Sequence, residues 1–124
     1  MPAEPIANLE QVRPAGETRG AVYREVLRRT SMSIGVYVIP KGAADPQSPH
    51  DEDEAYIVLR GRARFHCGSS ASWVAPGDLL YVPARESHHF DEVGEEMVLA
   101  VFFAPPEGSG RSDGPTVRPR TRSE

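Results

Sequence analysis

Apolar and polar residues alternate in short runs along most of this chain, and turn-forming residues separate the runs. Residues 31–40 show the pattern clearly, because Met32, Ile34, Val36 and Val38 all fall on one face of an extended strand. Between residues 31 and 103, no segment keeps apolar residues at helical spacing over ten positions. The alternation predicts strands at residues 21–28, 31–40, 54–59, 62–67, 71–74, 79–82, 88–92 and 97–103.

Glycine and proline mark the turns between these strands. Arg60-Gly61 is expected to form a hairpin turn, after which residues 62–67 return along residues 54–59. Pro76-Gly77-Asp78 is a turn by composition. Short strands at this spacing predict an all-β sandwich or barrel with little helix.

A single domain accounts for the 124 residues. We divide the chain into an N-terminal extension (1–19), a β-domain (20–104) and a C-terminal tail (105–124). The tail is expected to be flexible, because Val117 is its one apolar residue of the kind that is usually buried. A domain of this size can fold without stabilisation by a disulfide or a metal, so we expect a bound metal to have a functional rather than a structural role.

Charge and cysteine content narrow the classes of partner. The 14 Lys and Arg against 18 Asp and Glu give a net charge of −4, which lacks the positive field of a nucleic-acid-binding protein. Cys67 is the only cysteine, which excludes an intramolecular disulfide and fits a reducing compartment. No secretory signal and no apolar run near the roughly 20 residues of a membrane span are found. We expect a cytoplasmic protein whose ligand is a small molecule.

Histidine and acidic residues border several of the predicted strands. His50 precedes four consecutive acidic residues, and His88 and His89 follow the Pro83 turn. Imidazole and carboxylate groups are donors that hold divalent transition metals. The same residues also suit a solvated acidic turn and a surface or hydrogen-bonded histidine pair. His66 has no acidic or histidine neighbour within three residues, so we assign it a structural role.

Two spaced patterns contain the candidate donors. The first runs Gly42, five residues, Ser48, one residue, His50, three residues, Glu54, six residues, Gly61. The second runs Gly77, five residues, Pro83, one residue, Arg85, two residues, His88, three residues, Glu92. Together they resemble the two motifs of the cupin superfamily, in the form of a small single-domain cupin, and flanking strands extend the resemblance to about residues 20–104.

The resemblance implies a double-stranded β-helix, or jelly-roll barrel, with one divalent metal (Fe, Mn, Ni or Zn) bound by His50, Glu54 and His88. Ser48 stands where the family has its first histidine, and Arg85 and Glu92 replace a glycine and an asparagine. Serine is a poorer donor than imidazole. Gln47, Glu52 and His89 are the candidates for a fourth donor. On an extended strand His89 points to the opposite face from His88. Glu52 is an even-numbered position like His50 and Glu54, so it points to the same face as they do. A solvated turn remains the competing interpretation of Glu52.

The same alternation predicts which side chains line the barrel. Tyr56 and Val58 follow Glu54 on its face, and Phe90 follows His88. Tyr56 is a candidate catalytic residue, as a hydrogen-bond donor or acid, and Arg85 is a second, as a group that binds an anion. Further candidates for the lining or the core are Met32, Val36, Val38, Trp73, Tyr81 and Phe102.

Three classes of function stay open at this point, one of them a purely structural dimer formed through the exposed face of strands such as residues 31–40, with neither metal nor ligand. The two-histidine, one-carboxylate set favours a dioxygenase-type enzyme acting on a small organic molecule, with isomerase or lyase chemistry as variants. The alternative is a non-catalytic small-molecule-binding module with weak metal binding or none. The resemblance also implies a homodimer, and 13 Arg against one Lys hint at a GC-rich bacterial genome.

Overall fold

Six strands and no helix make up the described part of the chain, residues 3–12, 20–45 and 47–109 of a computed structural model. This confirms the all-β prediction, and no helix within those residues is long and apolar enough to cross a membrane. The strands are β1 (Val22–Arg28), β2 (Ser33–Ile39), β3 (Asp53–Cys67), β4 (Ser70–Val74), β5 (Leu79–Val82) and β6 (His88–Ala104).

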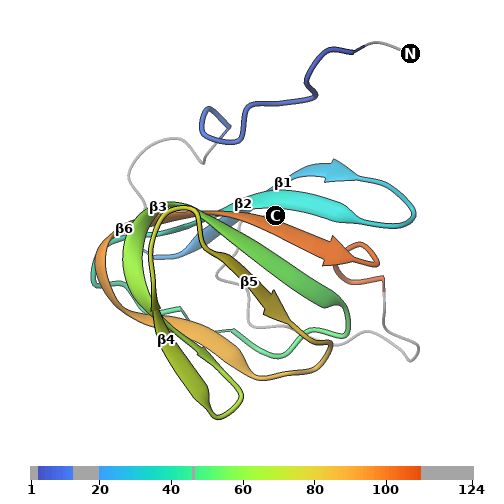
Figure 1. The fold of residues 1–124 in the computed structure, drawn as a ribbon. Helices are drawn as coiled ribbons and strands as arrows, with labels where there is room; N and C mark the ends of the chain where they lie inside the picture. Colours follow the sequence, from blue (N-terminus) through green and yellow to red (C-terminus); the bar gives the residue numbers. More distant parts are fainter. Residues whose placement is uncertain (1–2, 13–19, 46, 110–124) are drawn as a thin grey trace.

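The two longest strands, β3 and β6, pair with each other at the centre of one six-stranded antiparallel sheet. The first half of β3 pairs with β5 and with the second half of β6, which continues through β2 to β1. The second half of β3 pairs with β4 and with the first half of β6. In Figure 1 this sheet curls around an interior. The predicted jelly-roll barrel is therefore confirmed.

The hairpin turn predicted at Arg60-Gly61 is wrong, because β3 runs through this dipeptide without reversing. The pairing of β3 with β6 shifts register around Arg60 and Arg62, and Gly61 has φ +93°. This is a bulge, which bends a strand and changes the side to which the following residues point. Residues 88–92 and 97–103 likewise join into one strand. The buried side chains of β3 switch from even to odd positions across the bulge: Glu54, Tyr56 and Val58, then Ala63 and Phe65.

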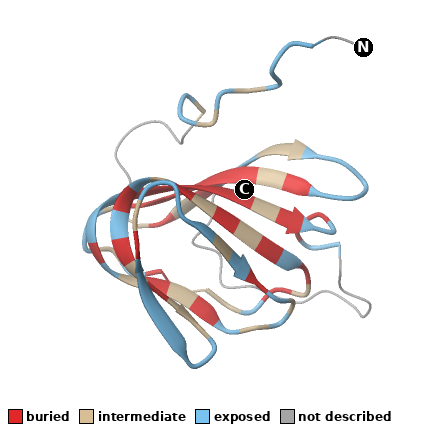
Figure 2. Cartoon of the chain, in the orientation of Figure 1, coloured by how far each residue is buried: buried red, intermediate tan, exposed pale blue. Residues whose placement is uncertain are grey.

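Alternating burial places the main core inside the barrel, as the striped strands of Figure 2 show. Tyr23, Tyr37, Tyr56, Phe90 and Phe103 are among its largest fully buried side chains. A smaller cluster of Val36, Val38 and Val98 lies apart from the main core, and Leu9 and Val12 of the N-terminal segment pack against it. The N-terminal segment therefore covers apolar surface of β2 and β6.

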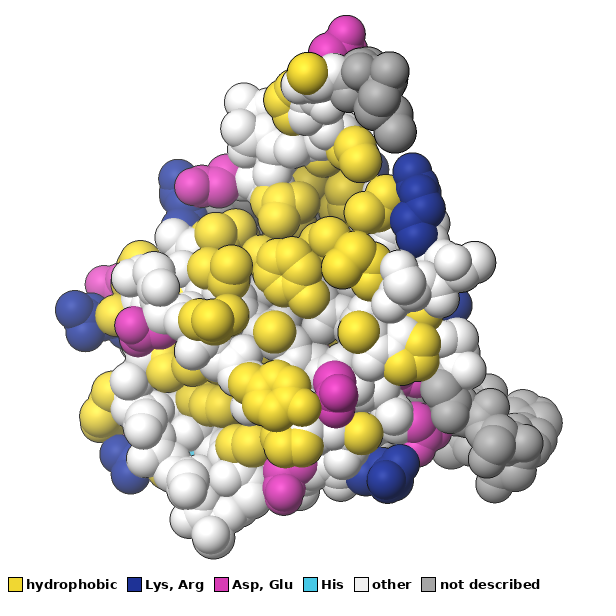
Figure 3. Space-filling model, turned by 45° about the vertical axis from the view of Figure 1, so that its right-hand side comes forward, with side chains coloured by type: hydrophobic (Ala, Val, Ile, Leu, Met, Phe, Trp, Pro, Cys, Tyr) yellow, Lys and Arg dark blue, Asp and Glu magenta, His cyan; other side chains and the backbone are white. Residues whose placement is uncertain are grey.

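Three aromatic or apolar side chains expected in the lining or core are exposed instead. Trp73 is 58%, Tyr81 59% and Met32 36% exposed. Tyr81 belongs to a cross-strand row of apolar residues, whose Cα pairing runs Leu27, Ile34, Phe102, Ala55, Tyr81. Figure 3 shows hydrophobic side chains gathered in a band on one face, below the N-terminal segment.

The described start of the predicted tail is packed against the barrel. Pro106 and Glu107 are buried, and the Glu107 amide donates to Ser33 Oγ at 3.0 Å. Arg28 donates from Nη2 to the Glu107 carbonyl at 3.0 Å. Residues 110–124, where most of the predicted tail falls, lie outside the described residues.

Candidate metal centre

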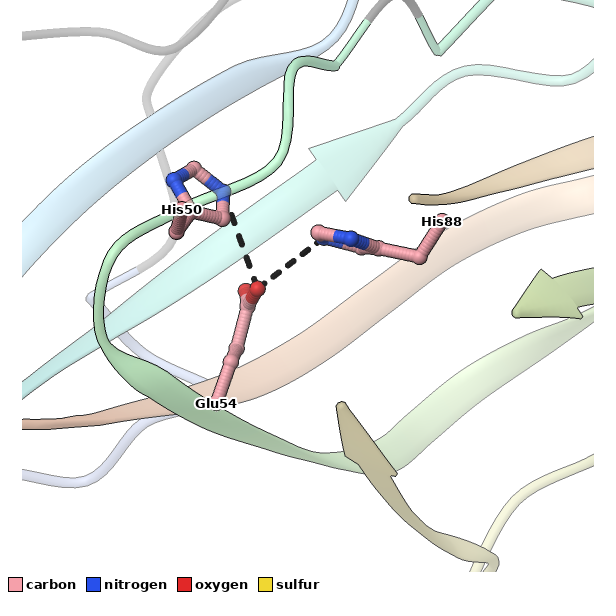
Figure 4. Close-up of side chains that lie close together, drawn as sticks. All are labelled: His50, Glu54 and His88. Atoms are coloured by element: carbon pink, nitrogen blue, oxygen red, sulfur yellow. Dashed lines mark ion pairs between the residues drawn. The ribbon is translucent and has the colours of Figure 1, made fainter. Parts of the chain in front are cut away.

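Three segments of the chain bring His50, Glu54 and His88 together inside the barrel (Figure 4). Glu54 is near the start of β3, His50 is in the loop before it, and His88 is the first residue of β6. Glu54 Oε1 lies 3.0 Å from His88 Nε2 and 3.6 Å from His50 Nε2. All three side chains are buried. The donors predicted from sequence thus converge around one point.

Backbone contacts hold the loop of His50 against the turn that precedes β6. The Arg85 amide donates to the His50 carbonyl at 2.5 Å. Arg85 has φ +66°, a left-handed conformation that favours glycine. The Arg85 side chain is exposed. The predicted anion-binding residue is therefore joined to the site through its backbone, with its guanidinium group at the surface.

His88 is oriented by a hydrogen bond on the far side of its ring. Its Nδ1 lies 2.9 Å from the Glu86 carbonyl oxygen. A carbonyl oxygen only accepts hydrogen bonds, so Nδ1 carries a proton, and in the neutral ring Nε2 therefore keeps its lone pair. Such a bond fixes the tautomer and the ring direction of a metal-ligating histidine. The nitrogen that faces Glu54 is thus the one suited to coordinate a metal.

The donor set and its spacing fit a divalent transition metal. Metal–donor bonds of about 2.0–2.1 Å at tetrahedral angles put neighbouring donor atoms about 3.3 Å apart. The carboxylate-to-imidazole separations of 3.0 and 3.6 Å bracket this value. Two imidazoles and one carboxylate also match the hard-to-borderline preference of Fe(II), Mn(II), Ni(II) and Zn(II).

Aromatic side chains surround the three donors. The ring of Phe103 packs edge-on to His50 at 5.1 Å between centroids. Tyr56 is fully buried, with its ring 6.3 Å from that of His88 and 5.2 Å from that of Phe90. The inward positions predicted for Tyr56 and Phe90 are confirmed.

A buried polar network beside the donors was not foreseen from the sequence. Asp45 accepts hydrogen bonds from the Tyr37 hydroxyl, from the Phe90 amide at 2.8 Å and from Gln47 Nε2 at 2.7 Å. Gln47 Oε1 in turn accepts from the Tyr56 hydroxyl at 3.4 Å. Asp45 therefore ties β2, the loop and β6 together and, through Gln47, positions Tyr56.

The other donors considered from sequence lie elsewhere. Glu52 is buried rather than solvated, and its Oε2 accepts from the Gly108 amide at 3.1 Å, so its carboxylate is directed to the 105–109 segment. Gln47 is engaged with Asp45. His89 lies on the opposite face from His88, as alternation predicted, and Ser48 is half-buried in the loop. The candidate group is thus His50, Glu54 and His88.

His66 has partners that its local sequence did not reveal. Its Nε2 lies 2.8 Å from Asp91 Oδ1, and its ring stacks on that of His89. Both partners come from β6, and the pairing of β3 with β6 brings them together. A search within three residues could not find them.

Comparison with known proteins bears on the identity of this fold. A protein of Streptomyces coelicolor without an assigned function is 38% identical over 107 residues, which cover 86% of this chain and 99% of that protein. The crystal structure of TT1209 from Thermus thermophilus matches with a TM-score of 0.73 and 23% identity, over 82% of this chain and 97% of the other. A Klebsiella pneumoniae protein with a double-stranded β-helix domain matches with a TM-score of 0.71 and 19% identity, over 87% and 94% of the two chains. The Cupin domain family profile matches residues 35–104, and the chain belongs to the cupin family.

Proposed function

We propose that this cupin binds one divalent transition metal through His50, Glu54 and His88 and acts there on a small organic molecule. The proposal rests on the convergence of three buried donors. The hydrogen bond from His88 Nδ1 to the Glu86 carbonyl turns the opposite ring nitrogen, Nε2, toward the other two donors. A metal held by two imidazoles and one carboxylate keeps open positions and supplies Lewis-acid activation of a substrate oxygen or, as iron, activation of dioxygen. This ligand set favours the dioxygenase variant over isomerase or lyase chemistry.

Tyr56 and Arg85 are the residues we propose to serve the substrate. The Tyr56 hydroxyl is held by Gln47 in the interior beside His88, where it can donate a hydrogen bond or a proton to a substrate oxygen. The rings of Phe65 and Phe90 pack against Tyr56 and keep water from that side of it. Arg85 is exposed beside the His50 loop and suits an anionic group on an incoming substrate.

Metal analysis tests the proposal. Untagged protein is stripped with a chelator, reconstituted separately with Fe(II), Mn(II), Ni(II) and Zn(II) without oxygen, freed of excess metal and analysed by mass spectrometry. We expect about one retained equivalent of one metal in the wild type and in the surface control Glu95→Gln, and loss of that equivalent in His50→Ala and Glu54→Gln. Circular dichroism establishes that the variants are folded.

Two outcomes would overturn the proposal. Metal retention in both interior variants equal to that of the wild type would place the metal elsewhere. Wild-type protein that retains none of the four metals would instead support the non-catalytic binding module. For the dioxygenase variant, iron-loaded protein is expected to consume oxygen only with an added small organic compound, at a rate that falls in Tyr56→Phe.

A further inference from the structure

A second cluster of metal-binding side chains lies on the outer face of the barrel. His66 on β3 and His89 on β6 are direct cross-strand neighbours, and Asp91 is the next outward residue of β6. Alternation sends His88 and Phe90 into the interior and His89 and Asp91 outward. One strand therefore carries side chains for two separate sites on its two faces.

The three side chains hold their donor atoms close to one another. The imidazole rings of His66 and His89 stack with their centroids 4.4 Å apart and their planes 3° apart. Asp91 Oδ1 lies 2.8 Å from His66 Nε2, and Asp91 Oδ2 lies 3.7 Å from His89 Nε2. One ligand atom from each residue lies within 4.8 Å of the other two. The two carboxylate-to-imidazole separations bracket the roughly 3.3 Å between donors around a tetrahedral metal. Because the two rings are almost parallel, one of them must turn about its Cβ–Cγ bond for both imidazoles to bind the same ion.

An ordinary hydrogen bond accounts for only part of this arrangement. The bond from His66 to Asp91 explains the 2.8 Å contact. It does not explain why His89 turns its Nε2 toward the second oxygen of the same carboxylate, at 3.7 Å, a distance too long for a hydrogen bond. Stacking on His66 fixes the plane of the His89 ring, and it leaves Nε2 of His89 on the side of the carboxylate, within reach of a cation bound there.

The three side chains of the cluster are partly open to solvent. Arg64 is the cross-strand partner of Asp91, and its guanidinium lies over the ring of Trp73, 5.7 Å from the centroid. On the other side of His66, its partner on β4 is the small Ala71. The side chains of His66, His89 and Asp91 are 29%, 44% and 45% exposed, so solvent reaches the cluster.

We propose that His66, His89 and Asp91 form a second metal site, which takes a borderline divalent cation such as Zn²⁺ and leaves a coordination position to water or an outside ligand. Two imidazoles and one carboxylate are donors that zinc binds well. Because this site is open, its metal exchanges with solvent more readily than a metal held by the buried donors. It shares no ligand with His50, Glu54 and His88.

Zinc titration of the full chain tests this site apart from the interior one. In the metal-free His50→Ala protein, and in Glu54→Gln in parallel in case the first fails to fold, calorimetry with Zn²⁺ alone is expected to show one equivalent bound. Adding Asp91→Asn or His66→Gln is expected to weaken that binding at least about tenfold, whereas the charge-matched surface change Glu95→Gln leaves it unchanged. In the wild-type background, Asp91→Asn is expected to remove one of two equivalents.

The proposal fails if His50→Ala and Glu54→Gln bind no zinc at millimolar concentration while folded. It also fails if Asp91→Asn and His66→Gln bind zinc as tightly as their parent proteins. Neither result bears on the interior site, which is measured by metal retention in the wild type and its loss in His50→Ala.

Discussion

The carbonyl oxygen of Glu96 lies so close to Gly61 that a β-carbon at position 61 would overlap it. Gly61 also has φ +93°, a region that favours glycine. Here β3 bends, and its buried residues switch from even-numbered to odd-numbered positions. The bend turns the second half of β3 to where it pairs with β4 and with the start of β6, which carries His88. The position of His88 relative to Glu54 thus depends on the missing side chain at Gly61.

Gly61→Ala is expected to lower the free energy of unfolding by about 3 kcal/mol, because it adds backbone strain and an overlap with rigid backbone. Gly77→Ala is the matched control: Gly77 has φ +95°, and a β-carbon there meets no heavy atom within 4 Å. Strain alone then costs about 1 kcal/mol. Urea denaturation of the metal-free proteins measures both, and equal losses would show that the contact with Glu96 carries no cost.

Asp45 is a second position where a single side chain supports the site. Its buried carboxylate accepts from the Tyr37 hydroxyl, the Phe90 amide and Gln47. Asp45→Ala is expected to lower the free energy of unfolding by about 3–5 kcal/mol, because it leaves these buried donors without their acceptor. Asp45→Asn is expected to cost less, since one oxygen remains as an acceptor.

Asp78 offers the control for Asp45 in an exposed turn. Its carboxylate accepts one bond, from the Ala75 amide at 2.8 Å. Asp78→Asn and Asp78→Ala are therefore expected to cost about 1 kcal/mol or less. Thermal and urea denaturation compare the two pairs of variants. An Asp45→Ala loss no larger than that of Asp78→Ala would contradict a structural role for the buried network.

Most of the fold was predictable from sequence because the strands follow alternating runs, and β1, β2, β4 and β5 are short runs separated by turns; β3 and β6 each join two predicted runs. The exception at Arg60-Gly61 has a physical reason, since this dipeptide suits both a tight turn and a bulge with positive φ. The choice is made by the pairing with β6, far along the chain. Trp73 and Tyr81 were misplaced for a related reason. In a strand as short as β4 or β5, the alternation of side chains does not show which of the two faces points inward.

The donors His50, Glu54 and His88 could be named because their spacing follows the two motifs of a known family. Asp45 and His66 carried no such signal. The partners of His66 come from β6, and Asp45 is a lone acid in a loop whose donors come from β2, β6 and the loop itself. Contacts of this kind follow from strand pairing rather than from neighbouring residues.

The pKa of the Cys67 thiol depends in part on the charge of Glu86. Burial and, second, the Glu86 carboxylate raise the pKa of the Cys67 thiol above its ordinary value. Removing the negative charge makes the thiolate easier to form, so Glu86→Gln is expected to lower the pKa of Cys67 and to speed alkylation at a fixed pH below that pKa. Desolvation is the larger cause, so the pKa is expected to stay above that of a free thiol.

Alkylation by iodoacetamide between pH 7 and 10 measures this effect cleanly, because Cys67 is the only cysteine. Glu95→Gln removes an acidic charge elsewhere on the surface and serves as the control. Equal alkylation profiles for Glu86→Gln and the wild type would show that Glu86 does not act on the thiol.

Ser48→His tests the slot in which this chain departs from its family. Ser48 is half-buried in the loop that carries His50, two residues before it. An imidazole there is a better donor than a hydroxyl, so zinc affinity at the interior site is expected to rise at least about tenfold, or about 1.4 kcal/mol. Competition with a chelating indicator measures this in an Asp91→Asn background, which removes the outer cluster. Ser48→Ala, the control, is expected to leave the affinity unchanged because the hydroxyl is a weak ligand. An unchanged affinity in Ser48→His would mean that position 48 does not face the donors, whereas a tenfold loss in Ser48→Ala would make the serine itself a ligand.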